Sequence, residues 1–378
     1  MTAYHSITLE NLYIHQQIDE AVEEKYISRE DADAIKLQKP VGLYMPNYFV
    51  KIGLGFLTFF IIISTAGLFV LFFNINYLMN VFAVFFGLSC YVVLEVMTRQ
   101  KKHYNSGVDT ILMAATVVSI TVGFINNKYG IGADLFASLI VFVLSSWMMF
   151  RFTDRLAAVT SFAALASFIY HGAALFSKIT LLLVPLFFIL FCSIIFISTK
   201  HYYHSTARLY FKPVLQIVFI MAILGFYVSG NVFIAEHLGE GLKIPLALNI
   251  FYWSWTIILP IIYLWRGLKT REITFVRSGI FFIAASILTY RYYHPILPPE
   301  IAMLLAGIIL ILLSYFLIKY LKNERFGFIF DNNRATNKYQ YVESLIIGQA
   351  FGNQPHEVKK NTAFGGGKFG GGGACGDF

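Results

Sequence analysis

The sequence contains little charge. Only 13% of its 378 residues are Asp, Glu, Lys or Arg, whereas 57% are hydrophobic and 17% are aromatic. Soluble domains are about 25% charged and about 45 to 50% apolar. This composition excludes an ordinary soluble enzyme and predicts a membrane protein.

Cysteine is also scarce. Cys90, Cys192 and Cys375 lie far apart, two of them within apolar stretches and the third in a glycine-rich tail. None of these spacings matches a CxxC pair or another metal-binding pattern. The sequence therefore indicates neither a disulfide framework nor a cysteine-based metal site.

Three other kinds of signal are missing. The first 25 residues lack the basic stretch and apolar core of a signal peptide, so we expect the N-terminus to stay in the cytosol. The sequence contains no HExxH, GxSxG, Walker or GxGxxG motif. The Gly-Gly-Gly-Lys-Phe segment of the tail lacks both the Walker spacing and the hydroxyl residue after Lys. We therefore predict no cofactor, and we favour a protein that is not an enzyme.

What the sequence does contain is a series of long apolar runs. A helix of about 20 apolar residues crosses the roughly 30 Å hydrocarbon core of a bilayer. The fold class that follows is an all-α bundle of about ten transmembrane helices. The runs fall at about 52–73, 77–97, 108–125, 133–150, 156–175, 179–198, 213–234, 245–265, 274–292 and 300–320.

The basic residues are unevenly distributed between the loops of this arrangement. With the N-terminus inside, the inner loops carry Arg99, Lys101, Lys102, Arg151, Arg155, Lys200, Arg208, Lys212, Arg266, Lys269, Arg271 and Arg277, and the outer loops only Lys128, Lys178, Lys243 and Arg291. Short cytoplasmic loops are enriched in Lys and Arg. We therefore predict a multi-pass protein of the cell membrane with both termini cytoplasmic. The basic residues behind the net charge of +8 then set the orientation of the chain in the membrane. We therefore expect the lipid bilayer, and no nucleic acid, as a partner.

Residues 1–50 predict a small helical hairpin ahead of the membrane domain at 51–320. Leu12, Ile18 and Val22 share one helical face, and Ser28 with Asp31 forms a capping-box-like start to a second helix. A hairpin this short is too small for a core of its own. We expect it to rest on the membrane domain or on a cytoplasmic protein partner.

Residues 321–378 predict a polar cytoplasmic tail. Eight of its last eighteen residues are glycine, which makes ordering entropically costly, so we expect the end to be flexible. Together with the N-terminal hairpin, this tail is the second candidate contact for a cytoplasmic protein partner. The sequence does not indicate an oligomeric state.

The segment from Ile18 to Ala32 contains the pattern Ile-Ser-Arg-Glu-Asp-Ala and is followed by many apolar runs. It resembles the N-terminal hairpin of a family of uncharacterised bacterial membrane proteins with a Leu-x-x-x-Gly-x-Ile-Ser-x-Glu-x-Ala pattern. The family's turn glycine is replaced here in the Lys25–Tyr26 region. The glycine-phenylalanine tail is similar to the ends of several other bacterial membrane proteins. Neither resemblance implies any site residue.

Two groups of ionisable residues are candidates for function. Glu95 lies one turn from the inner end of the second run, where it either pairs with Arg99 and Lys101 or serves as a proton or ion site. The other group combines carboxylates with histidines near the outer loops, which either bind a divalent metal or a substrate, or form a solvated surface. Its members are Asp134, His171, Glu236, His237, His294 and Glu300.

Uncharged polar residues within the seventh and eighth runs are the remaining candidates. Gln216, Asn231 and Asn249 lie there, beside Trp253. They either line a path for a solute or form hydrogen bonds between helices. Pro185 in the sixth run and Pro260 in the eighth predict bent helices, which transporters use for binding near the midplane.

Two functions remain in view. The spans, the short loops and the polar residues in the seventh and eighth runs favour a transporter or permease for a small solute. The alternative is a non-catalytic scaffold that recruits a cytoplasmic partner through the N-terminal hairpin and the glycine-rich tail. A polar cavity beside Gln216, Asn249 and Pro260 would favour transport, and a dry interior would favour the scaffold.

Overall fold

The computed structural model describes residues 2–23, 26–73, 79–125, 130–176, 178–204, 209–238, 244–270 and 272–294, with scattered positions between 298 and 319. In this part of the chain the regular structure is entirely helical, and the one β contact is an isolated bridge between Tyr44 and His103. The predicted all-α class is confirmed. The predicted tail, 321–378, lies outside the described residues.

Nine of the described helices are long and apolar enough to cross a membrane. They are α3 (Tyr48–Phe73), α4 (Met79–Arg99), α5 (Val108–Ile125), α6 (Ile131–Phe152), α7 (Arg155–Phe176), α9 (Val184–His204), α10 (Lys212–Gly230), α12 (Leu246–Thr270) and α13 (Ile273–Tyr293). The chain is thus a multi-pass membrane protein. The tenth predicted run, 300–320, is described only at scattered positions, and Ile301, Leu304 and Ile308 among them are helical.

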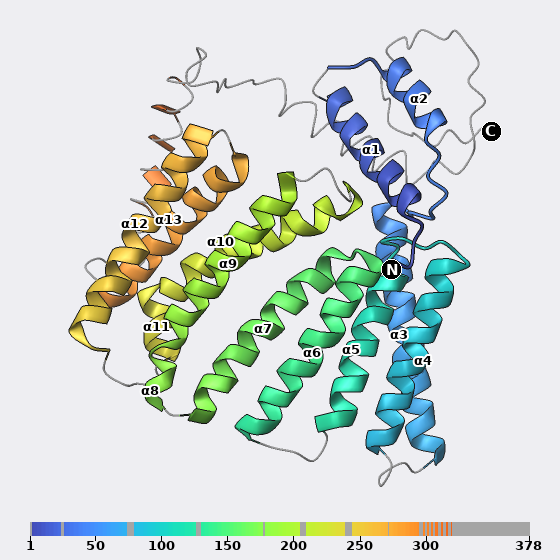
Figure 1. Ribbon diagram of the computed structural model, residues 1–378, viewed down its shortest axis with the longest axis horizontal. Helices are drawn as coiled ribbons and strands as arrows, with labels where there is room; N and C mark the ends of the chain where they lie inside the picture. Colours follow the sequence, from blue (N-terminus) through green and yellow to red (C-terminus); the bar gives the residue numbers. More distant parts are fainter. Residues whose placement is uncertain are drawn as a thin grey trace, which may run out of the picture.

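Successive spans run in alternate directions, so that Tyr48, Arg99, Arg155 and Ile273 all lie at one end of the bundle (Figure 1). We call this the hairpin end, because the N-terminal helices α1 (Ser6–Glu23) and α2 (Arg29–Gln38) sit over it. The other end is called the far end. Most of the basic residues that indicated inner loops belong to helix termini at the hairpin end.

The spans pack mainly as neighbouring hairpins, α4 with α5, α6 with α7, α9 with α10, and α12 with α13. The hairpins stand side by side in a row, with α7 near its middle (Figure 1). Helix α7 is rich in Ala and Ser, which let backbones approach closely, and it contacts α6 on one side and α9 and α10 on the other. A hydrogen bond of 2.7 Å between the Ser146 and Ser161 hydroxyls joins α6 to α7.

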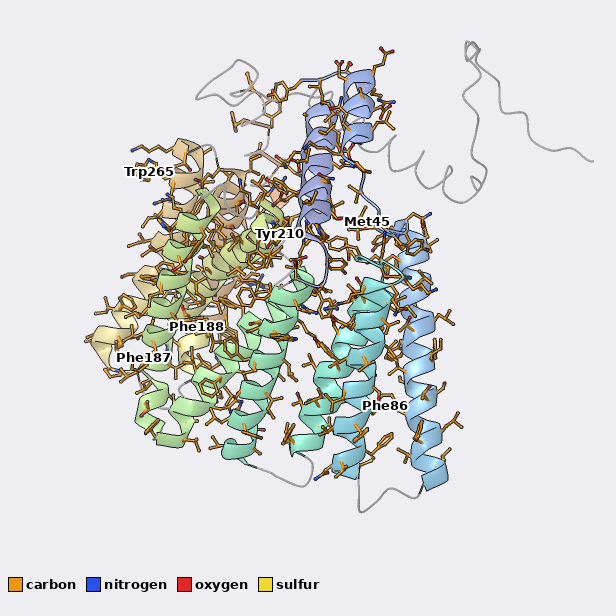
Figure 2. The ribbon with its side chains drawn as sticks, turned by 45° about the vertical axis from the view of Figure 1, so that its right-hand side comes forward. Met45, Phe86, Phe187, Phe188, Tyr210 and Trp265 are labelled. Carbon is orange, nitrogen blue, oxygen red and sulfur yellow. The ribbon has the colours of Figure 1, made fainter. Side chains whose placement is uncertain are left out.

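Much of the apolar surface points outward rather than into a core. Phe187 and Trp265, both labelled in Figure 2, are 55% and 62% exposed. Helix α3 is the extreme case, since only 6% of its most apolar stretch is buried. A soluble protein would hide such surface, whereas lipid tails solvate it without cost. Exposure of this kind supports the membrane assignment independently of helix length.

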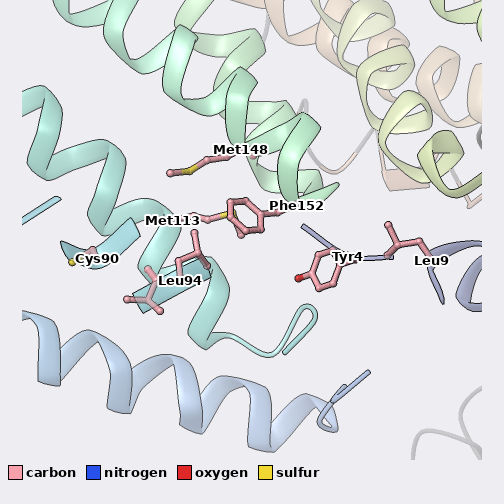
Figure 3. Packing of buried hydrophobic residues seen from close by; sticks show 9 residues of the cluster. Tyr4, Leu9, Cys90, Leu94, Met113, Met148 and Phe152 are labelled. Atoms are coloured by element: carbon pink, nitrogen blue, oxygen red, sulfur yellow. The ribbon is translucent and has the colours of Figure 1, made fainter. Parts of the chain in front are cut away.

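The largest buried cluster lies at the hairpin end, where α4, α5 and α6 meet the N-terminal segment. Tyr4 and Leu9 pack there with Leu94, Met113 and Phe152 (Figure 3). The Ala3 backbone N–H donates to the Arg151 carbonyl at 2.7 Å. The N-terminal hairpin therefore rests on the membrane domain, one of the two contacts that the sequence led us to expect.

The local signals in the hairpin behave as predicted. Ser28 is the N-cap of α2, and its hydroxyl oxygen accepts from the Asp31 backbone N–H at 3.1 Å. Ile18 and Leu12 are buried on the shared face of α1. Helix α1 lies against the short 3-10 helix η2 (Leu209–Phe211), which joins α9 to α10.

Two of the predicted runs are interrupted. The sixth divides into α8 (Lys178–Leu181) and α9, and Pro185 is the second residue of α9. The expectation that Pro185 bends a span is therefore wrong. Backbone N–H groups in the first turn of a helix have no partner within the helix, so a proline there removes no hydrogen bond. The seventh run, 213–234, is also wrong as one helix: α10 ends at Gly230, and α11 (Val232–Leu238) begins after Asn231.

Candidate functional site

A cavity of about 220 Å³ lies at the hairpin end between α9, α10 and the start of α13. Its apolar floor is formed by Phe196, Phe219 and Phe275. The centroids of Phe196 and Phe219 are 5.2 Å apart, and those of Phe219 and Phe275 are 5.8 Å apart. Such close ring contacts fix the floor, since aromatic pairs at this separation attract each other.

The rim of the cavity is polar and carries both signs of charge. It consists of Thr199, Lys200, Gln216, Glu272 and Thr274, with Leu215 completing the lining. Among the described residues, no ion pair joins Lys200 to Glu272. The cavity therefore presents one cation, one carboxylate and one amide above an aromatic floor.

The Glu272 carboxylate is not used by the helix that it precedes. Glu272 is the N-cap of α13 in an extended conformation, and its side chain makes no capping hydrogen bond. Its backbone carbonyl instead accepts from the Phe275 N–H at 3.1 Å. The backbone thus holds the start of α13 while the carboxylate stays at the rim.

Arg266 supports the floor from α12. Its guanidinium carbon lies 5.4 Å from the centroid of the Phe275 ring, within the range of a cation–π contact. Gly267, one residue on, packs so closely on α13 that a Cβ there would lie 2.6 Å from the Val276 nitrogen. These contacts tie the end of α12 to the start of α13.

A second polar feature lies toward the far end, where α10 breaks. Asn231 is buried between α10 and α11, and its Oδ1 accepts from the Phe233 N–H at 3.0 Å, which caps α11. The Val232 N–H donates to the Thr256 hydroxyl of α12 at 3.1 Å. Two of the backbone donors freed by the break, the Val232 and Phe233 N–H groups, therefore have partners.

The same break is the centre of a hydrogen-bond chain across three helices. The Asn231 amide donates to the Tyr227 hydroxyl at 3.1 Å and to the Thr289 hydroxyl at 3.2 Å. Tyr227 is 3.0 Å from the Ser286 hydroxyl, which itself donates to the Thr256 carbonyl at 2.6 Å. With Tyr227 donating to Ser286, every member has a partner and the chain is complete.

Glu95 lies in a different part of the bundle, on α4. Its Oε1 accepts from the Arg99 Nε at 2.6 Å and also pairs with Arg151 of α6. The side chain of Glu95 is 21% exposed and that of Arg151 13%. The carboxylate thus lies between two arginines, with Arg151 rather than Lys101 as its second partner.

Acidic groups also gather beneath the N-terminal segment. The Asp109 Oδ1 accepts from the Ser106 N–H at 2.9 Å, and the Asp154 carboxylate accepts from the Ala157 N–H at 2.7 Å to cap α7. Burial, followed by the Asp109 charge, raises the pKa of Asp154. Burial and Asp109 likewise raise the pKa of Tyr4, whose hydroxyl donates to the His103 carbonyl at 2.9 Å.

The predicted path residues do not converge on one place. Gln216 lies at the cavity, whereas Asn231 is fifteen positions further along the same helix, about 22 Å away at 1.5 Å per residue. Asn249 and Trp253 belong to the first turns of α12, at the far end. Trp253 packs there against Tyr293, with ring centroids 5.4 Å apart.

The predicted outer residues divide between two places at the far end, α6 with α7, and the corner where α11 and α12 meet the end of α13. Asp134 begins α6 and His171 is near the end of α7, while Glu236 and His237 are on α11. Glu236 accepts from the Tyr293 hydroxyl.

His237 and His294, which follows α13, contact aromatic rings instead. His237 lies against the Phe233 ring at 4.0 Å, and His294 lies 5.9 Å from the Trp253 centroid. Glu300 lies outside the described residues. Among the residues that are described, no group of three His, Cys, Asp or Glu side chains is placed to hold a metal ion.

Sequence reasoning selected Gln216 but passed over the other polar residues of the cavity. Lys200 had been read only as a topology charge, and Glu272 had not been selected. The sequence did contain one signal for these residues, because Lys200, Gln216 and Glu272 all occupy span ends on the same predicted side of the membrane. Hydropathy does not show which of these span ends are neighbours.

Comparison of the chain with protein-family models, with curated proteins and with solved structures finds no significant match. Function must therefore be inferred from the geometry of this chain.

Proposed function

We propose that this multi-pass membrane protein is a transporter or permease for a small solute, and that the solute binds in the cavity beside Gln216. The observation that carries the proposal is the cavity itself, an aromatic floor with a charged rim at the ends of three spans. Small-molecule sites combine apolar walls with a few polar groups in this way. An uncharged solute would need only the amide and hydroxyl groups of the rim.

One helix that lines the cavity and one that packs beside it contain irregular backbone of the kind that transporters use. Helix α10 provides Gln216 and breaks at Gly230, and α12, which packs on α13, carries Pro260 in its interior. Transporters use interrupted helices to change access to a binding site. Rotation about these two points would move the rim of the cavity relative to the far end.

We place the protein in the cell membrane with the hairpin end in the cytoplasm. The basis is the excess of Lys and Arg in the loops of that end, twelve against four. In this orientation the cavity opens toward the cytoplasm. Reactivity of a cysteine introduced at exposed Gln100 toward an impermeant thiol reagent, in intact cells and in inverted vesicles, tests the orientation.

Uptake into proteoliposomes tests the transport proposal. Vesicles containing the full chain are incubated with a mixture of amino acids, sugars, nucleosides and small organic acids, and their contents are measured by mass spectrometry. We expect at least one solute to accumulate with saturable kinetics. Gln216→Ala should reduce its uptake about tenfold, the effect of losing one hydrogen bond to a solute. Gln100→Ala, an exposed glutamine at the same end, is the matched control and should behave as wild type.

Accumulation no greater than in protein-free vesicles, with the protein folded, would refute transport of these classes and favour the scaffold. One observation favours that alternative on its own account: α1 and α2 expose several carboxylates to solvent, among them Asp19, Glu20, Glu30 and Asp33. The scaffold predicts a stoichiometric partner that is lost when residues 1–45 and 361–378 are removed.

A further inference from the structure

We infer that the cavity between α9, α10 and α13 binds a zwitterion that carries a short apolar group. The inference rests on the proposed function, because it concerns the same cavity, and it adds the chemical class of the ligand. Three properties of the described residues lead to it: the volume, the pair of opposite charges and the aromatic floor.

The volume limits the part of the ligand that lies inside the cavity. A cavity of about 220 Å³ holds roughly seven water molecules at about 30 Å³ each. The bound part of the ligand therefore has a similar number of non-hydrogen atoms. A single amino acid or the headgroup of a lipid is of this size.

The two charges favour a ligand that carries both signs. Lys200 belongs to α9 and Glu272 precedes α13, so the ammonium and the carboxylate come from different helices, and both are exposed at the rim. A ligand with only one charge would be attracted by one of them and repelled by the other. A zwitterion can place its anionic group at Lys200 and its ammonium at Glu272.

The floor adds a requirement for an apolar group. Phe196, Phe219 and Phe275 line the cavity, and Leu215 adds an aliphatic side chain. Burying a butyl-sized group there gains the usual hydrophobic contribution. The cation–π position near Phe275 is already taken by Arg266, so the ligand's ammonium belongs at the carboxylate of the rim and not over that ring.

This chemistry has two natural sources. One is a free zwitterion with an apolar side chain, such as leucine. The other is the phosphoethanolamine headgroup of a lipid, since the cavity lies at the span ends where headgroups would be. Both offer an ammonium and an anion next to apolar matter, and experiment can separate them.

Binding to the purified full-length chain in detergent tests the class with defined probes. The probes are L-leucine, 3-methylbutylamine, which lacks the carboxylate, 4-methylpentanoate, which lacks the ammonium, and glycine, which lacks the apolar group. Calorimetric titration should show leucine binding about tenfold to hundredfold more tightly than each analogue, because each loses one anchoring interaction.

Two substitutions make the assignment specific. Lys200→Gln should abolish the preference for leucine over the amine, and Glu272→Gln should abolish the preference for leucine over the acid. Lys101→Gln, an exposed lysine at the same end, should leave both preferences intact. A merely structural role of Lys200 or Glu272 would weaken all probes alike, and that result would overturn the inference.

The lipid source is tested in parallel. Native mass spectrometry of protein extracted from phosphatidylethanolamine vesicles should show one retained lipid that Lys200→Gln and Glu272→Gln lose. Phosphatidylglycerol, which has no ammonium, should not be retained. Retention of this lipid, or tight binding of leucine, supports the zwitterion class and identifies its source. If leucine binds no better than its analogues and neither lipid is retained selectively, the inference is wrong.

These outcomes are distinguishable from failure of the transport proposal. Leucine that binds with the expected preferences but does not enter proteoliposomes would refute transport and leave the ligand class standing. Uptake of a sugar or a nucleoside that depends on Gln216 but not on Lys200 or Glu272 would refute the zwitterion class and leave the transport proposal standing.

Discussion

The Ser286 hydroxyl of α13 lies 2.6 Å from the Thr256 carbonyl of α12 and 2.7 Å from the Phe282 carbonyl of its own helix, so the two carbonyls share its one proton. Pro260 lies four residues after Thr256 and has no N–H, so the carbonyl loses its partner within the helix. The serine of the neighbouring span replaces that partner. An unsatisfied carbonyl is costly in hydrocarbon, so this bond makes the proline tolerable at its position.

Ser286→Ala should therefore destabilise the protein by about 1 to 2 kcal/mol, because both the Thr256 carbonyl and the Tyr227 hydroxyl lose a partner. Thermal unfolding in detergent measures the effect. Ser254→Ala, at an exposed serine of the partner helix α12, should change stability little. In a Pro260→Ala background, the restored N–H can pair with Thr256, so the cost of Ser286→Ala should shrink. An equal cost in both backgrounds would contradict the proline explanation.

Gly230→Ala tests the packing at the helix break. A Cβ at Gly230 would clash with the Trp255 ring, whose Nε1 is held by a hydrogen bond of 3.0 Å to the Phe226 carbonyl. The ring cannot move away without breaking that bond, so we expect a loss of about 1 to 3 kcal/mol, typical of overpacking. Gly67→Ala is the control, because a Cβ there meets nothing within 4 Å. Equal thermal stability of the two variants would show that the break is not packed as described.

Glu95→Gln should destabilise the hairpin end of the bundle. The carboxylate pairs with Arg99 and Arg151, and the amide leaves both arginines their charge without its counter-charge. We expect a loss of about 1 to 3 kcal/mol in denaturant unfolding, the range for charged hydrogen bonds. If transport is found, its pH dependence should be that of the wild type, since the carboxylate is engaged by two arginines and does not line the cavity. A changed pH profile would revive Glu95 as a proton site.

Asp154→Asn should change how stability depends on pH. Burial and the Asp109 charge raise the pKa of Asp154 above its ordinary 3.8, while the Ala157 N–H and Lys51 lower it by less. The folded state then binds the proton more tightly than the unfolded state does. The contribution of Asp154 is therefore greatest below about pH 4 and is lost as the pH rises through the raised pKa.

The asparagine removes that loss and can still accept from the Ala157 N–H as the N-cap of α7. We expect Asp154→Asn to be at least as stable as wild type at pH 7 and to lose less stability between pH 4 and pH 7. Melting temperatures across this range measure the difference. Asp33→Asn, at an exposed carboxylate of α2, should not alter the slope. A steeper fall in Asp154→Asn would show that the sign is reversed.

Tyr4→Ala should loosen the N-terminal hairpin from the bundle. The side chain is 7% exposed, and its hydroxyl donates to the His103 carbonyl. Losing a buried aromatic side chain costs about 3 kcal/mol or more, so the hairpin should detach from the bundle more often. We expect trypsin to cleave after Arg29 and Lys36 several times faster, measured by mass spectrometry. His5→Ala, at the exposed neighbouring position, should be cleaved at the wild-type rate.

The sequence predicted the helices well where hydropathy alone determines them. The run at 108–125 coincides with α5, and Ser28 marks the start of α2, because both depend on local composition. The break after Gly230 was missed because Val232, Phe233 and Ile234 continue the apolar run. It is stabilised by contacts from elsewhere, chiefly the Thr256 hydroxyl on the Val232 N–H.

The candidate site was predictable only in part. Gln216 was recognisable as a polar residue in an apolar run, and it lies at the cavity. Lys200 and Glu272 follow no motif, and they meet Gln216 only because α9, α10 and α13 adjoin at one end. Adjacency of helices depends on side-chain packing such as Phe196 against Phe219, which one sequence does not reveal.

The position of α1 against η2 has a consequence for biosynthesis. The chain emerges from the ribosome N-terminus first, at about 5 to 20 residues per second. Six of the nine candidate spans lie between α1 and η2, namely α3, α4, α5, α6, α7 and α9. The contact site of Tyr4 exists once α6 has been made, but α1 cannot reach η2 until all six have been inserted. The first segment to be synthesised thus docks only after six spans have been made, while α10, α12 and α13 are still to follow.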